Sequence, residues 1–333
     1  MHINKKSLEN FFLVFSLTLF LCVVIMPRAV SHFLVPDTKA ETIQIYMEKT
    51  EELYQDILKD AEKGKTKNIT DYSFTMLADS TFLQDSAFTE ALLYNTPFLM
   101  KWTETTNSLF PGVTKMEFYG RSEGFTNQHI AEAEKKADEI TAYINSRNCS
   151  SYRWEVTELL GYTREYAHYL MQDENFEENM TKKFAHEAWS CLISGEPVCD
   201  GYSRAVEMIC EKLDVPCICV IMPGTAEKPG HQWNLIYLDG HWYHADFTNS
   251  HINWRSRVDF MKYMEKYPPD IAYTKYLEDS LAETFFYLEY EDENFFLVTN
   301  DVIRKHFSYD AESAALLIEA KYPELLEDYL KDL

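Results

Sequence analysis

The feature that most constrains the fold is a β-hairpin signal over residues 231–248. Two runs of β-prone residues flank Asp239-Gly240, a dipeptide that favours a two-residue hairpin turn. With that turn, residues 238 and 241 oppose each other. Opposed residues, and residues two apart along a strand, share a face of the sheet. His231 and Asp246 are therefore expected as diagonal neighbours on one face, with Cα atoms about 7–8 Å apart.

An amphipathic helix is expected just before the hairpin, over residues 200–213. Its apolar residues recur at helical spacing: Tyr202, Val206, Ile209, Cys210 and Leu213. Pro197 precedes this stretch, where a proline can open a helix but not continue one. Cys199 therefore lies at or near the helix N-terminus, where unbonded N–H groups and the positive end of the helix dipole favour a thiolate. The neighbouring carboxylate of Asp200 opposes this effect modestly.

These two predictions bring together the groups that a thiol-dependent enzyme needs. A nucleophilic cysteine requires a base, and the base works better when a third group orients it. Cys199, His231 and Asp246 supply one group of each type, and we expect the cysteine helix to pack on the face that carries the other two. His244 shares that face and is a competing candidate, although it is also a simple cross-strand neighbour of Leu235. The plainer alternatives are a buried core cysteine and a half-exposed hairpin with incidental polar residues.

Three short blocks of the sequence contain these residues: VCDGYS at 198–203, HQWN at 231–234 and WYHADFT at 242–248. In this order the blocks resemble the transglutaminase-like superfamily, in particular its bacterial secreted members with a Cys-His-Asp triad. The resemblance implies an α+β fold with a papain-like transglutaminase core, in which an active-site cysteine helix packs on an antiparallel β-sheet, with helical flanks. It also implies that Cys199 is the nucleophile, His231 the base and Asp246 the group that orients the base.

The blocks differ from the family pattern at a few positions. Gln232 stands in place of the usual alanine, Ala245 in place of valine, and Asn249-Ser250 in place of an acidic Trp-Asp-Asp run. None of these differences removes a member of the triad. Tyr202 and Trp233 lie within the blocks and are candidate substrate-binding residues.

The resemblance implies an exported, cysteine-dependent acyl-transfer enzyme that acts on protein or peptide amides. Such an enzyme is a thiol hydrolase when water resolves the acyl-thioester, and a transglutaminase when a protein amine does. We favour a peptidase or deamidase over a crosslinking enzyme, because bacterial relatives resemble hydrolases more. This chemistry requires no metal ion and no organic cofactor. The alternatives are a non-catalytic surface binding module on the same fold and a structural export protein whose cysteines are all core residues.

The acidic net charge argues against two classes of partner, nucleic acid and anionic membranes. The 333 residues carry a formal net charge of −23. The chain therefore has no generic electrostatic affinity for nucleic acid or for an anionic membrane surface. A protein or peptide substrate is the expected partner, and the oligomeric state stays open.

The cysteines predict thiols rather than a disulfide framework. Cys22 belongs to the N-terminal apolar segment. If Cys199 is a free nucleophile, five others remain: Cys149, Cys191, Cys210, Cys217 and Cys219. An odd number does not make a complete set of disulfides, so buried free thiols are expected. A zinc site is the weaker alternative, since no histidine lies at ligand spacing next to them.

The N-terminal 31 residues have the pattern of a targeting segment. Lys5 and Lys6 precede an apolar run over residues 11–26, which Pro27, Arg28 and small residues follow. This is typical of a signal peptide or of a single membrane anchor, and the run is short for a membrane span. We therefore expect an extracellular or cell-surface protein, attached to the membrane through this segment where the segment is retained.

The rest of the chain divides into three predicted parts. Residues 32–126 form an N-terminal helix plus a mixed subdomain, residues 127–310 the transglutaminase-like core, and residues 311–333 a C-terminal acidic helix. Other helices are expected at 37–61, 127–145, 152–171, 180–192, 258–290 (interrupted at Pro268-Pro269) and 301–306, and other strands at 114–119, 216–222 and 295–299.

Removing residues 1–31 tests whether they are a targeting segment. The segment carries a net charge of +2, so the remaining chain carries −25. A more acidic chain without its apolar run should express as a soluble protein without detergent, as measured by size-exclusion chromatography of the cell lysate. Aggregation of the truncated chain would instead show that the segment is part of the folded structure.

Overall fold

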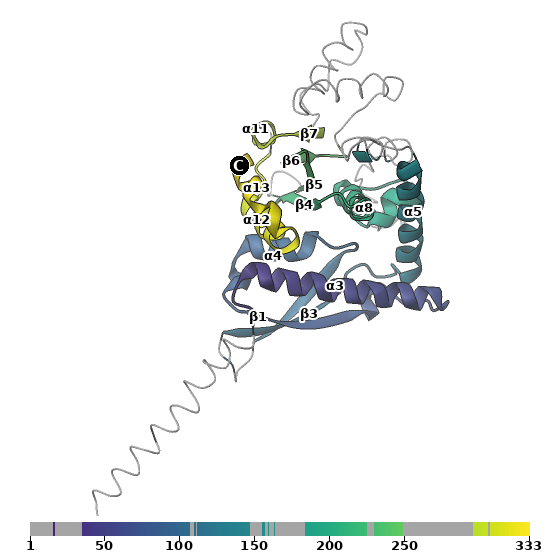
Figure 1. The fold of residues 1–333 in the computed structure, drawn as a ribbon. Coiled ribbons are helices and arrows are strands. Elements are labelled where there is room, and N and C mark those ends of the chain that lie inside the picture. Colours follow the sequence, from purple (N-terminus) through teal and green to yellow (C-terminus); the bar gives the residue numbers. More distant parts are fainter. Residues whose placement is uncertain are drawn as a thin grey trace, which may run out of the picture.

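The fold is α+β, as predicted, and is built from two antiparallel sheets with helices packed on them (Figure 1). The computed structural model describes residues 35–106, 112–146, 184–224, 230–248, 296–305 and 307–333, together with residues 16, 110, 155, 156, 159 and 163. The helix expected at 152–171 is described at four of its residues, all helical. The expected helix at 258–290 lies outside the described residues, as does the segment 1–31 apart from residue 16.

The first sheet has three strands with a long helix across one face. The strands are β1 (Ser73–Asp79), β2 (Met100–Thr106) and β3 (Val113–Gly120), in the order β1-β3-β2. The helix is α3 (Lys39–Glu62), and the shorter α4 (Ser86–Tyr94) and the 3-10 turns Ile69–Asp71 and Phe82–Gln84 complete this part. The predictions of a helix at 37–61 and a strand at 114–119 are confirmed, whereas β1, β2 and α4 were not predicted.

Local signals in the sequence explain why α3 begins where it does. The Thr38 hydroxyl accepts a hydrogen bond from the Glu41 N–H, and the Glu41 carboxylate accepts one from the Thr38 N–H, which together form a capping box. The helix then presents Tyr46 to the sheet, where its ring lies 4.7 Å from that of Phe118 on β3. Both rings are buried, so this aromatic contact fixes the helix on the sheet.

The second sheet contains the predicted hairpin. Its strands are β4 (Cys217–Met222), β5 (His231–Leu238), β6 (His241–Ala245) and β7 (Phe296–Val298), paired in that order and all antiparallel. Asp239 and Gly240 have φ angles of 53° and 89°, the positive values that a type I′ turn requires. Leu238 pairs with His241 as predicted, and the same register continues to the pair of Asn234 and Ala245.

Helices cover both faces of the second sheet. On one face lies α8 (Cys199–Lys212), which also contacts α5 (Asn127–Ser146). On the other side lie the C-terminal helices α11 (Asn300–Ile303), α12 (Ala311–Lys321) and α13 (Leu326–Asp332), drawn in yellow in Figure 1. The sheet is therefore held between the helix that begins with Cys199 and the end of the chain.

Two predicted helices differ from the structure. The C-terminal helix is broken into α12 and α13, because Pro323 cannot continue the first helix and opens a 3-10 turn over Pro323–Leu325 instead. In the described part of 180–192, residues 184–187 form turns, and the helical stretch ends in a π-helix over Ser190–Ser194. The turn forms because the Ala185 carbonyl accepts hydrogen bonds from the Val198 N–H and the Ser190 hydroxyl instead of a helical partner.

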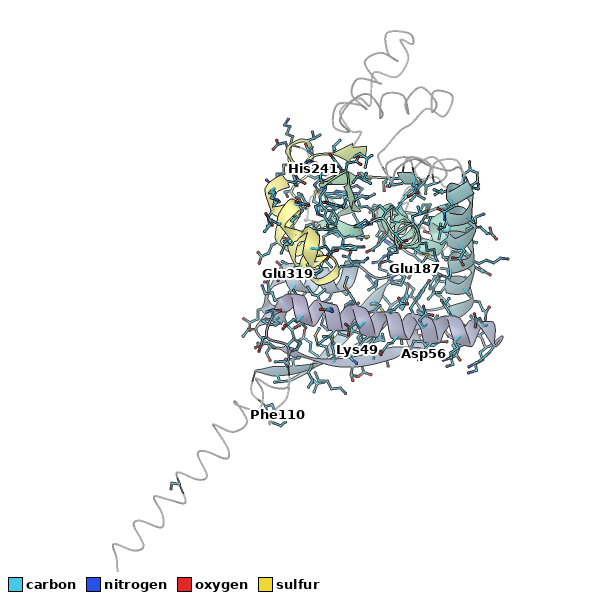
Figure 2. The ribbon with its side chains drawn as sticks, viewed as in Figure 1. Lys49, Asp56, Phe110, Glu187, His241 and Glu319 are labelled. Atoms are coloured by element: carbon cyan, nitrogen blue, oxygen red, sulfur yellow. The ribbon has the colours of Figure 1, made fainter. Side chains whose placement is uncertain are left out.

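Side chains from all parts of the described chain share one buried apolar cluster. It contains Ile43 and Phe118 from the first part, Ile209 and Trp233 from the centre, and Tyr329 from the end. Figure 2 shows side chains filling the space between the helices and the sheets, and the buried Glu187 lies among them. None of the described helices is long and apolar enough to cross a membrane.

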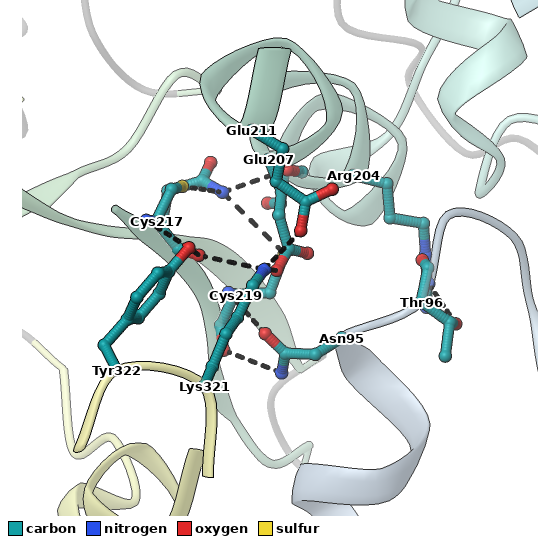
Figure 3. Close-up of polar contacts among 11 residues, drawn as sticks. Asn95, Thr96, Arg204, Glu207, Glu211, Cys217, Cys219, Lys321 and Tyr322 are labelled. Carbon is teal, nitrogen blue, oxygen red and sulfur yellow. Dashed lines mark hydrogen bonds and ion pairs between the residues drawn. The ribbon is translucent and has the colours of Figure 1, made fainter. Parts of the chain in front are cut away.

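A buried ion pair ties the C-terminal helix α12 to α8. Lys321 Nζ lies 2.9 Å from Glu207 Oε1 and also bonds Glu211 (Figure 3). The second Glu207 oxygen accepts a hydrogen bond from Cys219 Sγ at 3.3 Å. Burial raises the pKa of Glu207, and the charge of Lys321 opposes this rise. The side chains of Lys321 and Glu207 are 17% and 8% exposed, so water does little to screen their charges.

Replacing Lys321 by methionine should destabilise the fold. Lys321→Met keeps most of the side-chain volume but leaves Glu207 without its counter-charge, and removing one partner of a buried pair costs about 3–5 kcal/mol. We expect a loss of that size in the free energy of unfolding, measured in urea, and a smaller loss at acidic pH, where Glu207 takes up a proton. Lys331→Met is the control, because Lys331 is 62% exposed and its loss should leave the free energy of unfolding nearly unchanged. Equal effects of the two substitutions would contradict a stabilising role for the pair.

Candidate active site

Cys199 is the first residue of α8 and differs from the other described cysteines in exposure. The residue before it, Val198, has an extended backbone, and its side chain does not cap the first N–H groups of the helix. Cys199 is half-buried, whereas the other described cysteines are buried, and none of the five is in a disulfide. Burial raises the pKa of the Cys217 and Cys219 thiols well above the usual value. The expectation of buried thiols is confirmed for four residues: Cys191, Cys210, Cys217 and Cys219; Cys149 lies outside the described residues.

Close packing at the start of α8 explains the glycine in the first sequence block. A Cβ atom at Gly201 would lie 2.3 Å from the carbonyl oxygen of Ala185 and 2.6 Å from the hydroxyl oxygen of Ser190. Both distances are shorter than a van der Waals contact allows. Only a residue without a side chain lets the 185–190 segment approach this turn of the helix. Gly201 therefore sets the position of the helix end that carries Cys199.

His231 joins the other two candidate residues. Its Nε2 lies 2.7 Å from Asp246 Oδ2, and its side chain is also hydrogen-bonded to Cys199. Asp246 is fully buried, and its other carboxylate oxygen accepts a hydrogen bond from the Thr248 N–H at 2.9 Å. The carboxylate can only accept, so His231 donates from Nε2 and has Nδ1 left for the thiol. The three residues predicted from the sequence are thus in contact, in the order Cys199, His231, Asp246.

Charge at this site favours the protonated imidazole. Burial lowers the pKa of His231, but the charge of Asp246, its hydrogen bond and the contact with Cys199 raise it more, to about 10. A protonated imidazole beside a thiol stabilises the thiolate form, since the two opposite charges attract at short range. The structure thus places a protonated imidazole, held by a buried carboxylate, against the Cys199 side chain.

The cysteine helix packs on the opposite face of the sheet from the one predicted. Asn234 Nδ2 donates to the Ser203 carbonyl of α8 at 2.9 Å, and side chains alternate along a strand, so α8 covers the Asn234 face rather than the Trp233 face. The contact between His231 and Cys199 forms in spite of this. His231 is the first residue of β5 and Asp246 follows the last residue of β6. Both therefore lie at the end of the sheet, where their side chains reach the start of α8.

His244, the competing histidine, has a different set of contacts. Its Nδ1 accepts a hydrogen bond from Trp233 Nε1 at 2.9 Å, and its Nε2 lies 3.0 Å from Asn300 Oδ1. Complete burial lowers the pKa of His244 to about 4, so the ring is neutral at pH 7. It pairs with Leu235 across the hairpin, as predicted. The Trp233 ring in turn stacks on His231, with ring centres 5.5 Å apart, so His244 supports the site through Trp233.

The two candidate substrate-binding residues are buried. Tyr202 is 0% exposed and Trp233 1% exposed, which leaves neither a surface to offer a substrate. Both belong to the apolar core between α8, the sheet and the C-terminal segment. In the described residues no group of three or more His, Cys, Asp or Glu side chains is arranged to hold a metal ion.

One polar pair near Cys199 was not predicted from the sequence. His186 Nδ1 lies 2.8 Å and 2.9 Å from the two carboxylate oxygens of Asp200. His186 stands 13 positions before Cys199 in a stretch that was expected to be a regular helix. No spacing rule links such a residue to the start of the next helix, and only the turn at residues 184–187 brings them together.

Comparison with solved structures finds neighbours among transglutaminases and cysteine proteases. One, "Crystal structure of a TGase", has 13% sequence identity, covers 55% of this chain and 54% of its own, and gives a TM-score of 0.30. Another, a proposed cysteine protease from Cytophaga hutchinsonii, has 10% identity, covers 55% of this chain and 66% of its own, and gives a TM-score of 0.27. The chain thus matches less than two thirds of each neighbour's length. No protein-family model and no curated protein matches the chain.

Gly201 offers a direct test of how the cysteine end of α8 is positioned. Gly201→Ala places a Cβ atom against the Ala185 carbonyl, and we expect the free energy of unfolding in urea to fall by about 2 kcal/mol. Asp214→Gly at the other end of the helix is the control. Asp214 has a φ of 58°, which glycine adopts without strain, so stability should change little or rise. If both variants are as stable as the parent protein, the close contact at Gly201 does not fix the helix.

Proposed function

We propose that the protein is a cysteine-dependent acyl-transfer enzyme of the transglutaminase-like kind, acting on protein or peptide amides. One observation carries the proposal. The His231 side chain is hydrogen-bonded to Cys199 and to the buried Asp246 carboxylate at the same time. A nucleophile, a base and a group that orients the base are what thiol catalysis needs, whereas a protein that only binds needs none of them in this order.

In the proposed reaction, the Cys199 thiolate attacks the carbonyl carbon of the substrate amide. The backbone N–H of Cys199, at the start of α8, is a donor for the developing oxyanion. His231 holds the proton that left the thiol and gives it to the departing amine as the C–N bond breaks. An acyl-thioester remains on Cys199. Water or a second amine then attacks the thioester carbon, His231 takes the proton of that nucleophile, and the thiolate is released.

The same residues serve hydrolysis and amine transfer, so the outcome depends on which nucleophile resolves the thioester. We favour water, and therefore a peptidase or deamidase, on the resemblance of the sequence blocks to bacterial secreted proteins. The apolar segment within residues 1–31 supports action outside the cell or at its surface. The proposed reaction uses no cofactor, and the proposed partner is a protein or peptide substrate.

A single assay separates these outcomes. The purified protein is incubated with casein and a primary-amine probe, and released fragments, released ammonia and incorporated probe are measured together. Fragments indicate a peptidase, ammonia alone a deamidase, and probe incorporation an acyltransferase. Cys199→Ala should abolish every product. If the parent protein forms none of them and its Cys199 thiol is unreactive, the protein is a binding module on this fold.

Asp246→Asn tests the group that orients the base. Asparagine keeps the shape and can still accept from the Thr248 N–H, so the fold should be retained. It removes the charge that raises the pKa of His231 to about 10, and this pKa should fall toward or below 6.5. Since His231 then loses its proton at lower pH, we expect turnover to drop by about 10³–10⁴ and the alkaline limb of the pH–rate profile to move to lower pH.

The control for this prediction is Asp239→Asn in the exposed hairpin turn. Asparagine tolerates the positive φ of this position as well as aspartate does. Its turnover should stay within about twofold of the parent protein, because the turn lies far along the strands from His231. Near-normal turnover of Asp246→Asn would show that another acid orients His231.

A further inference from the structure

A second histidine–carboxylate pair lies beside Cys199 and takes no part in the reaction proposed above. His186 Nδ1 contacts both oxygens of Asp200, at 2.8 Å and 2.9 Å. Asp200 follows Cys199 directly and is the second residue of α8. The Asp200 side chain is 14% exposed and that of His186 34% exposed, so the pair lies at the rim of the site.

Backbone contacts hold His186 at this end of the helix. The carbonyl of Ala185 accepts a hydrogen bond from the Val198 N–H at 3.0 Å. The oxygen of the same carbonyl lies 2.3 Å from the position that a Cβ atom of Gly201 would take. Since His186 is the next residue, its ring is carried to the first turn of α8 by two backbone contacts. The pair with Asp200 is therefore built into the fold, unlike an ion pair between two long side chains at the surface.

The other charges close to His186 have partners of their own. Glu187 is buried (Figure 2) and accepts hydrogen bonds from the Leu99 N–H at 2.9 Å and from the Ser122 hydroxyl. Arg204 is buried and donates to the hydroxyl and the carbonyl of Thr96 (Figure 3). Glu187 and Arg204 act on His186 with opposite signs.

Asp200 is the main group that raises the pKa of His186. Burial lowers the pKa of His186, but the hydrogen bond and the charge of Asp200 raise it more, and Glu187 adds to the rise while Arg204 opposes it. The net direction is upward, which favours the imidazolium. A positive ring against the carboxylate leaves the pair close to neutral overall.

Without its partner, the Asp200 carboxylate would act on the charge of Cys199. A carboxylate one residue from Cys199 repels a thiolate, and its effect is largest where water screens it least. We propose that His186 is a positioning residue whose positive charge, held against Asp200, cancels the field that this carboxylate would exert on the Cys199 thiolate. The inference deepens the proposed function and rests on Cys199 being its nucleophile. His231 exchanges the proton, and His186 sets how much of the thiol is ionised.

The test is the pH dependence of alkylation at Cys199 in the full-length protein. Iodoacetamide is the probe, and the rate of carbamidomethylation at Cys199 is followed by mass spectrometry from pH 4 to pH 10. The variants are His186→Gln, Asp200→Asn and the double substitution. Glutamine can still donate to Asp200 but never carries a charge, so His186→Gln should move the midpoint of the profile upward by about half a pH unit or more. In the Asp200→Asn background, the same substitution should move it no further.

A charge-restoring variant separates this role from a merely structural one. His186→Lys puts a positive charge back near Asp200 and should return the midpoint toward that of the parent protein. A structural role would lower the labelled fraction or the melting temperature without moving the midpoint. An unchanged midpoint in His186→Gln, or the same shift with and without Asp200, overturns the inference while leaving the proposed function standing. Failure of Cys199 to react ahead of the buried Cys191 in the parent protein overturns both.

Discussion

The buried carboxylate of Asp246 is the constraint on which the site depends. A fully buried charge is costly unless it is paired and hydrogen-bonded, and Asp246 is hydrogen-bonded to the Thr248 N–H and to the His231 imidazole. Of these two groups, the imidazole is the one that can carry the opposite charge. His231 is held as an imidazolium for this reason, and its remaining nitrogen is directed to Cys199. The charge on the imidazole that contacts Cys199 is thus coupled to the burial of the carboxylate on its other side.

The end of the chain completes the same site from the far side of the sheet. Asn300 bonds His244, His244 accepts from Trp233, and Trp233 stacks on His231. The Phe307 ring also lies 5.5 Å from that of His231. Through these contacts the C-terminal segment restricts the orientation of the imidazole. Residues 296–333 are therefore part of the site's support, and the ion pair of Lys321 and Glu207 holds them to the cysteine helix.

Local signals made much of this site predictable from the sequence. The Asp239-Gly240 turn fixes the hairpin register, and the register brings His231 and Asp246 together. The prediction of which sheet face α8 covers was wrong. An apolar stripe indicates that a helix is buried, but it does not indicate which of the two faces of a sheet the helix covers. Both faces of this sheet are apolar, with Cys217 and Cys219 on one and Trp233 on the other. His186 was missed for a similar reason: its position depends on a turn that close packing at Gly201 stabilises and that no periodic pattern reveals.

Two carboxylates around the start of α8 are paired with histidines. Asp246 is paired with His231, Glu187 is hydrogen-bonded and close to Arg204, and Asp200 is paired with His186. Asp246 and Asp200 each have a histidine partner supplied by a different segment of the chain, and Glu187 accepts hydrogen bonds from the Leu99 N–H and the Ser122 hydroxyl. In a protein with a net charge of −23, an uncompensated carboxylate here would add to a general field that already disfavours a thiolate. Local pairing removes the nearest contributions to this field. The positive end of the α8 dipole, which favours an anion at the first residue of a helix, then acts on the position of Cys199 with less opposition.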